Sequence, residues 1–181
     1  MLIREATLAD IPQIHQLSRE ITYSNISKSE LGFLVANYSE ERYAQFIDHS
    51  IFYVAETDQK IVGYRLAVEV GNPKHLHTFT SLDKVTWETI DLRTVKNLIY
   101  LQQSGISLNY RRRGIASATL NKLYEQYPEH TCFCAIAEKP IRNHASISFF
   151  ENKGYKRVGY YKPTRYKDID EYMSGRYALI R

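Results

Sequence analysis

Apolar and polar positions alternate along the chain with two different periods. Where apolar side chains recur every three to four residues, they form one face of a helix that packs against the rest of the protein. This spacing predicts helices at residues 7–20, 29–38, 39–50, 81–90, 114–127 and 142–154. Ser39 stands directly before two acidic residues and is a favoured N-cap, and Gly154 is a favoured C-terminal cap.

Shorter apolar or alternating runs predict strands at residues 2–7, 51–56, 61–70, 98–108, 131–138, 155–162 and 171–181. The turn at residues 57–60 is expected to join the second and third strands as a hairpin. Apart from the helix at 81–90, residues 71–97 show no clear period, which indicates an insertion or long loop. The predicted fold class is α+β (mixed α/β), with one sheet and helices on its faces.

The composition limits the number of domains and the classes of partner that the chain can have. A length of 181 residues, with 44% apolar and 24% charged residues, is typical of one globular domain spanning residues 1–181. No apolar run approaches the roughly 18 residues that cross a bilayer, and the start lacks a secretory pattern, so we expect a cytoplasmic protein without a membrane partner. The net charge of +4 is too small to predict nucleic-acid binding without a concentrated patch.

The two cysteines, Cys132 and Cys134, stand two residues apart in a predicted strand. They would share one face of that strand, which is a poor geometry for a mutual disulfide. Without a second group of cysteines or histidines, they do not predict a metal site. We expect two buried thiols and no metal.

Three consecutive arginines, Arg111–Arg113, precede Gly114 where a strand gives way to a helix. The first turn of a helix exposes free N–H groups and carries positive potential, so this added charge is costly unless an anion lies there. Gly114 and Ala116 would let a ligand approach the backbone. The motif therefore predicts a site for a pyrophosphate, and a solvated basic turn is the alternative. It has neither the Lys-Ser/Thr of a P-loop nor the three glycines of a dinucleotide fingerprint.

This motif and a later segment together resemble the GNAT superfamily of acyl-CoA N-acyltransferases. Arg111 to Ala116 matches the Q/R-x-x-G-x-G/A pyrophosphate loop of that family. The second family pattern is matched by Asn143, Ser146, Phe149-Phe150 and Gly154-Tyr155. The predicted order of strands and helices also resembles the family across nearly the full chain.

The resemblance implies a mostly antiparallel sheet of about seven strands, whose fourth and fifth strands splay apart around the pantetheine of acetyl-CoA. Gly105 would provide a bulge or a close approach in the fourth strand. Asn143 would contact the cofactor, and the alternative is that it caps a helix, because Asn is a favoured N-cap. The cofactor-binding residues implied by the resemblance are Ile106, Ser107, Leu108, Arg111, Arg112, Arg113, Gly114, Ile115, Ala116, Ser117, Asn143, Ser146 and Phe150.

The catalytic residues are less clear, because the strand at 98–108 has no acid where many family members have a glutamate. Tyr100, close to that position, and Glu69, on the preceding strand, are candidate bases. Gln102 and Gln103 could hold a water but cannot act as bases. Phe150 stands where the family commonly has a proton-donating tyrosine. Alternative acids or bases are Tyr160, Tyr161, Tyr166, Tyr172, His75 and His77.

The expected function is that of an acetyl-CoA-dependent N-acetyltransferase. It would act on a primary amine of a small molecule or a protein or peptide, by direct attack within a ternary complex. One alternative is a non-catalytic acyl-CoA-binding module that has lost the acid and the base. Another is a nucleic-acid binder that uses the arginine run and the tyrosines. The last strands could pair between two chains, which would form a homodimer.

Overall fold

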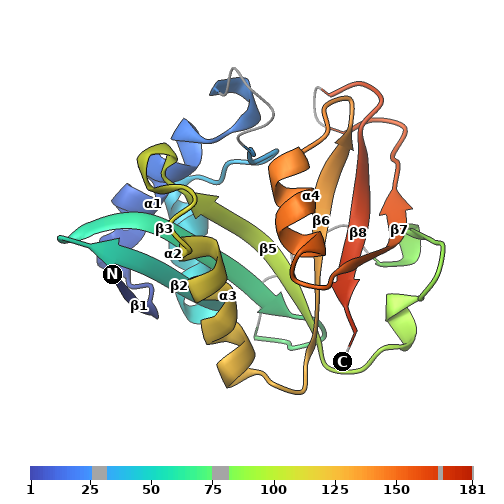
Figure 1. Ribbon diagram of the computed structural model, residues 1–181, viewed down its shortest axis with the longest axis horizontal. Coiled ribbons are helices and arrows are strands. Elements are labelled where there is room, and N and C mark those ends of the chain that lie inside the picture. Colours follow the sequence, from blue (N-terminus) through green and yellow to red (C-terminus); the bar gives the residue numbers. More distant parts are fainter. Residues whose placement is uncertain (26–31, 75–81, 167–168, 181) are drawn as a thin grey trace.

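The computed structural model describes residues 1–25, 32–74, 82–166 and 169–180. Within these residues the strands form one eight-stranded sheet in the order β1-β2-β3-β5-β6-β8-β7-β4 (Figure 1). The strands are β1 (Leu2–Glu5), β2 (Ile51–Thr57), β3 (Lys60–Glu69), β4 (Thr86–Trp87), β5 (Leu98–Ile106), β6 (Thr131–Lys139), β7 (Lys156–Tyr161) and β8 (Met173–Leu179). The α-helices are α1 (Ile11–Glu20), α2 (Glu40–His49), α3 (Ile115–Gln126) and α4 (His144–Glu151).

Short 3-10 turns connect several of these elements. They are η1 (Leu8–Asp10), η2 (Tyr23–Asn25), η4 (Leu82–Lys84), η5 (Leu92–Thr94) and η6 (Leu108–Tyr110). Within the described part of the chain, no helix is both long enough and apolar enough to cross a membrane.

One pair of neighbouring strands, β5 and β6, runs parallel, and the other neighbours run antiparallel. β5 and β6 pair only from Leu98 to Leu101 and from Thr131 to Cys134. Beyond these residues the two strands diverge, as Figure 1 shows. The mixed, mostly antiparallel sheet with two splayed central strands is therefore confirmed. The splayed strands carry the labels β5 and β6 because the two-residue β4 precedes them.

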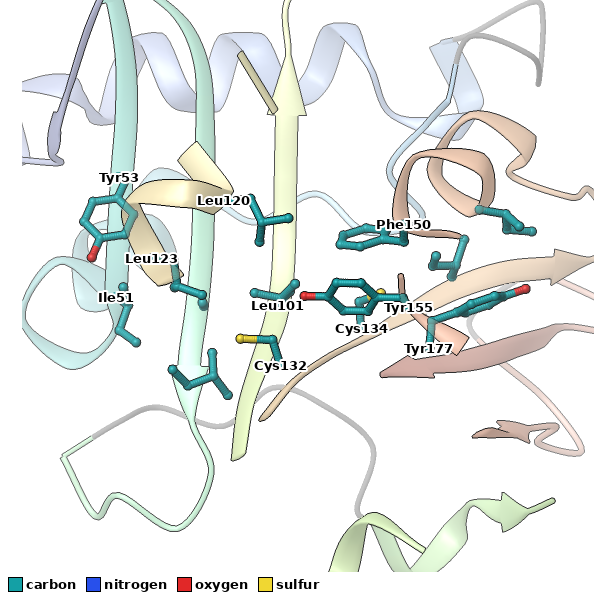
Figure 2. Packing of buried hydrophobic residues seen from close by; sticks show 14 residues of the cluster. Ile51, Tyr53, Leu101, Leu120, Leu123, Cys132, Cys134, Phe150, Tyr155 and Tyr177 are labelled. Carbon is teal, nitrogen blue, oxygen red and sulfur yellow. The ribbon is translucent and has the colours of Figure 1, made fainter. Parts of the chain in front are cut away.

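Helices cover both faces of the sheet. On one face, α1 and α2 pack over a cluster that includes Ile14, Phe46 and Tyr64. On the other, α3 and α4 contribute Leu120 and Phe150 to the largest cluster (Figure 2). We refer to these as the α1/α2 face and the α3/α4 face. Because side chains alternate along a strand, each position in β3, β5, β6 or β8 can be assigned to one of them.

The two cysteines lie on the α3/α4 face, close to Leu101 and Tyr155 in Figure 2. Both are buried and reduced, as expected. Burial raises the pKa of the Cys134 thiol, which therefore stays protonated at neutral pH. The thiols serve as small core residues.

Two predicted helices are wrong. Residues 29–31 lie outside the described part of the chain, and residues 32–38 are not helical, because Gly32 has φ +74° and Leu34 bridges to Thr22. In place of the helix at 81–90, of which Ser81 is not described, the chain forms η4 and then β4. There Thr86 and Trp87 add a strand to β7. Contacts with distant residues outweigh the local helical pattern in both segments.

The bulge expected at Gly105 lies three residues earlier. Leu66 of β3 pairs with Gln103 and Ala67 pairs with Leu101, so Gln102 is the extra residue of β5. At Gly105, a β-carbon would clash with the ring of Tyr64, which packs against the backbone there. The glycine therefore accommodates a core tyrosine.

Candidate functional site

A cavity of about 170 Å³ lies where β5 and β6 diverge. From the α3/α4 face it is lined by Arg65, Ser146 and Phe150, and from the α1/α2 face by Tyr38 and other tyrosines. Residues 33–36 form another part of its wall. The cavity therefore reaches both faces of the sheet through the gap between two strands, so two molecules entering from opposite sides could meet in it.

The N-terminus of α3 lies beside this gap. Gly114 adopts the left-handed conformation at the N-cap, with φ +80°, and no side chain caps the helix. A β-carbon at Gly114 would meet no atom within 4 Å, so its surroundings are open. Arg112 and Arg113 are exposed next to it, and the Arg113 guanidinium lies 5.1 Å from the centre of the Tyr110 ring. An uncapped helix end with two exposed arginines fits a ligand that carries phosphates.

Arg111, the first arginine of the run, turns inward. Its Nη2 donates to the main-chain oxygen of Gly32 at 3.2 Å, and its Nε donates to that of Ile106 at 3.4 Å. Burial lowers the pKa of Arg111, and its Nη1 is buried without a hydrogen-bond partner among the described residues. The side chain thus joins the end of β5 to the segment that lines the cavity.

Asn143 is the N-cap of α4. Helix capping was the alternative to a role in contacting the cofactor. Its Oδ1 accepts from the backbone N–H of Ser146 at 3.2 Å, and its Nδ2 donates to the main-chain oxygen of Phe33 at 2.9 Å. Asn143, Ser146 and Phe150 all line the cavity. The asparagine therefore shapes the cavity wall while its amide holds α4 and the segment at residue 33.

Of the two candidate bases, only Tyr100 lines the cavity. Burial raises the pKa of its hydroxyl, so it stays protonated at neutral pH. Glu69 pairs with Ile99 in the part of the sheet where β5 and β6 are still together, and it contacts His130 and Asn72. Its position does not support a role as the base. His75 and His77 lie outside the described residues.

The two glutamines of β5 have different surroundings. Gln103 accepts hydrogen bonds from the hydroxyls of Tyr43 and Tyr64 and donates to the main-chain oxygen of Ala36. The amide of Gln103 is therefore engaged in hydrogen bonds within the protein. Gln102, the bulge residue, donates weakly to Tyr38 at 3.3 Å, and its Oε1 is buried without a donor among the described residues. Of the two glutamines, only Gln102 has an amide oxygen without a donor among the described residues.

Two buried arginines that the sequence analysis missed also line the cavity. Arg65 on β3 is 1% exposed and Arg176 on β8 is 4% exposed. Arg65 lies on the α3/α4 face, where it donates to Thr119 and to the main-chain oxygen of Ala116. A signal was present, because each arginine stands inside an apolar run of a predicted strand.

The charged side chains among the described residues that line the cavity are all positive. None of the described residues that line it has a carboxylate, whereas both arginines do line it. Of the four tyrosines considered as alternative acids, Tyr161, Tyr166 and Tyr172 line it, whereas Tyr160 pairs with Thr86 of β4. The site therefore offers cations, phenol hydroxyls and one amide oxygen.

Comparisons with known proteins place this geometry in context. A family model described as "Acetyltransferase (GNAT) family" matches residues 12–155. A ribosomal-protein-alanine N-acetyltransferase from Brucella melitensis has a similar structure, with a TM-score of 0.69, 20% identity and 100% coverage of each chain. No curated protein sequence gives a significant match.

Two further solved structures have the same fold. Arabidopsis thaliana NAA60 in complex with acetyl-CoA matches with a TM-score of 0.68 and 15% identity, covering 99% of each chain. An N-acetyltransferase from Staphylococcus aureus matches with a TM-score of 0.66 and 19% identity, covering 98% of this chain and 96% of the other.

Proposed function

The chain belongs to the GNAT acetyltransferase family, and on that premise we propose that it is an acetyl-CoA-dependent N-acetyltransferase. The acceptor is a primary amine of a small molecule or a peptide, which attacks directly within a ternary complex. The observation that carries this proposal is the cavity at the divergence of β5 and β6, which reaches both faces of the sheet.

The α3/α4 side of the cavity fits the cofactor. From Gln102 to Ile106, the edge of β5 that faces away from β3 has no strand partner among the described residues, so its backbone groups can bind a pantetheine. Ser107 uses its N–H for the main-chain oxygen of Val62, which leaves other backbone groups of Ile106–Leu108 for that role. Arg112, Arg113 and the amides of Ile115, Ala116 and Ser117 would hold the pyrophosphate.

Arg65 is a further candidate contact for the cofactor. Its Nη1 is buried and lacks a hydrogen-bond partner among the described residues, and the side chain lines the cavity on this face. A donor in that position suits a carbonyl oxygen of the pantetheine arm or of the acyl group. Acetyl-CoA, when bound, supplies an activated acyl carbon and a thiolate leaving group.

The residues on the α1/α2 side suit an amine that binds without its proton. A protonated lysine-type amine, with a pKa of about 10.4, cannot attack. Positive charge nearby favours the neutral amine, and the described lining contains two guanidinium groups and no carboxylate. The Oε1 of Gln102, which has no donor among the residues that the structure describes, can accept an N–H of the amine and orient its lone pair. The protein thus lowers the pKa of the acceptor without a dedicated base.

A second candidate is a module that binds acyl-CoA without catalysis. It is favoured by the lack of a carboxylate among the described lining residues and by Phe150, whose ring cannot donate a proton. This module and the enzyme would share the same cofactor site, so they differ only in turnover.

The test combines calorimetry with acetyl-CoA and thiol release over a panel of amines, polyamines and peptides. The variant Arg112→Glu, Gly114→Trp is expected to lose acetyl-CoA binding. Its control, Lys60→Glu, Gly71→Trp, makes similar changes at two exposed positions that do not line the cavity, and it should bind normally. Binding with amine-dependent thiol release supports the enzyme, and binding without turnover supports the module. Binding that survives in the first variant would contradict our placement of the cofactor.

A further inference from the structure

Arg176 is a buried cation on the α1/α2 side of the cavity. It alternates along β8 with Tyr177, which packs in the cluster of the α3/α4 face. Its Nη1 donates to Ser174 Oγ at 2.8 Å and, more weakly, to the main-chain oxygen of Ser174 at 3.4 Å. Its guanidinium lies 5.6 Å from the centre of the Tyr161 ring.

These contacts orient the guanidinium but do not neutralise it. Among the residues that the structure describes, no carboxylate lies within ion-pair distance of Arg176. A guanidinium that is only 4% exposed is costly to bury without an anion. Elsewhere in the chain, Arg4 and Arg157 have carboxylate partners although they are more exposed. Arg176 and, on the opposite face, Arg65 line the cavity without such a partner among the described residues.

Neutral aromatic groups surround this charge. The rings of Tyr166 and Tyr172 stack with their centres 4.1 Å apart, and both line the cavity with Tyr161. Burial raises the pKa of Tyr166 to about 12, so its hydroxyl keeps its proton at neutral pH. The tyrosines therefore add apolar walls and no negative charge, so none of the described residues around Arg176 supplies it with an anion.

We infer that the acceptor amine also carries a carboxylate, which binds Arg176 while the amine reaches Gln102 at the bulge of β5. This inference rests on the proposed function. The planar fork of a guanidinium matches a carboxylate. Arg176 and Gln102 can bind complementary groups. Among the described residues, Arg176 has no anion and Gln102 Oε1 has no hydrogen-bond donor. An amine that carries a carboxylate supplies both.

Arg65 does not serve the same purpose, because it lies on the opposite face. Its guanidinium bonds to Ala116 and Thr119 of α3, on the cofactor side. The carboxylate in question can come from a free amino acid or from an acidic side chain at the start of a peptide. A cavity of about 170 Å³ is smaller than typical ligand sites, so only a small acceptor, or the first residues of a peptide, fits inside.

The test uses matched acceptors that differ only in the carboxylate. One arm compares free amino acids with their amides, and the other compares peptide amides that begin with Glu or with Gln. For at least one arm, we expect the acid to have a kcat/KM about tenfold or more above its neutral partner. In Arg176→Met this ratio should fall to within about threefold of one. The arm that shows the preference identifies the source of the carboxylate.

Controls separate this inference from the proposed function. Arg93→Met, at an exposed arginine of η5, should keep the wild-type ratio. Ser174→Ala keeps the charge of Arg176 and removes its orienting hydroxyl, so it should lower the ratio in part even if Arg176→Met does not fold. Direct calorimetry of the same acids and amides, without acetyl-CoA, should show the same preference.

Equal turnover or equal binding of acids and amides by the wild-type protein would overturn the inference and leave the enzyme proposal intact. If the wild-type protein does not bind acetyl-CoA, the proposed function is overturned instead. Calorimetry of the acids alone would then still decide whether Arg176 binds a carboxylate.

Discussion

The guanidinium of Arg111 donates to the main-chain oxygen of Gly32, a residue 79 positions earlier in the chain. This bond joins the turn before α3, on the proposed cofactor side, to the segment that continues through Phe33 into the wall of the cavity. Gln103 and Asn143 hold the same segment through the main-chain oxygens of Ala36 and Phe33. Three distant side chains thus position one stretch of backbone against the site.

Replacing Arg111 with alanine should therefore affect the acceptor more than the cofactor. Loss of the bond to Gly32 should lower the free energy of unfolding by about 1–2 kcal/mol, measured by urea denaturation. The KM of the acceptor should rise more than the dissociation constant of acetyl-CoA. Arg112→Ala, at an exposed position, should weaken acetyl-CoA binding with little change in stability. The reverse pattern in the two variants would contradict these assignments.

Gly114→Ala separates backbone strain from ligand contact. Because Gly114 has φ +80°, alanine there should cost about 1–2 kcal/mol of unfolding free energy, although the structure leaves room for the β-carbon. Gly71, with φ +84° and equally open surroundings, is a matched control. Both variants should lose similar stability in thermal unfolding, and only Gly114→Ala should weaken acetyl-CoA binding. Equal affinity in the two variants would argue against a ligand at the N-terminus of α3.

The pH dependence of turnover should follow the pKa of the acceptor amine. Burial raises the pKa of Tyr100, with a smaller opposing effect from Arg176, so between pH 6 and 9 the hydroxyl is a phenol and cannot take a proton. The rate should rise with pH as the acceptor amine loses its proton. The midpoint should lie lower for an α-amine, with a pKa of about 8, than for a lysine-type amine, at about 10.4.

Tyr100→Phe is the variant that checks this prediction. It should leave the midpoint of the pH–rate profile in place for each acceptor, even if the rate itself changes. A midpoint that is the same for all acceptors, and that moves in Tyr100→Phe, would identify Tyr100 as a base.

Arg65→Met should separate stability from cofactor binding. Burial lowers the pKa of Arg65, which reflects the cost of keeping a charge inside the protein. Methionine has a similar reach, and the hydroxyl of Thr119 has its own acceptors in Ile115 and Ala116. Unfolding free energy should therefore stay constant or rise by about 1 kcal/mol. The dissociation constant of acetyl-CoA should rise about tenfold in calorimetry, because a donor in the cavity wall is lost. Unchanged affinity would remove Arg65 from the cofactor site.

Local patterns in the sequence were sufficient for the elements whose neighbours are close in the chain. The hairpin of β2 and β3 and the helix after Gly114 appear within a few residues of the predicted bounds. Side-chain period and cap residues act over one or two turns, and they can therefore be recognised without knowledge of the rest of the fold. The family motif around Gly114 belongs to the same class of signal.

The amino-acid sequence by itself determined the mixed sheet, its covering helices and the basic glycine turn at α3. Only the tertiary structure decided that residues 32–38 are not helical, that Gln102 is the bulge, and that Arg65 and Arg176 line one cavity from opposite faces. These features depend on strands and loops that are far apart in the chain. Their free energy comes from burial and from hydrogen bonds between distant residues, which outweigh local preference and leave no periodic signal in the sequence.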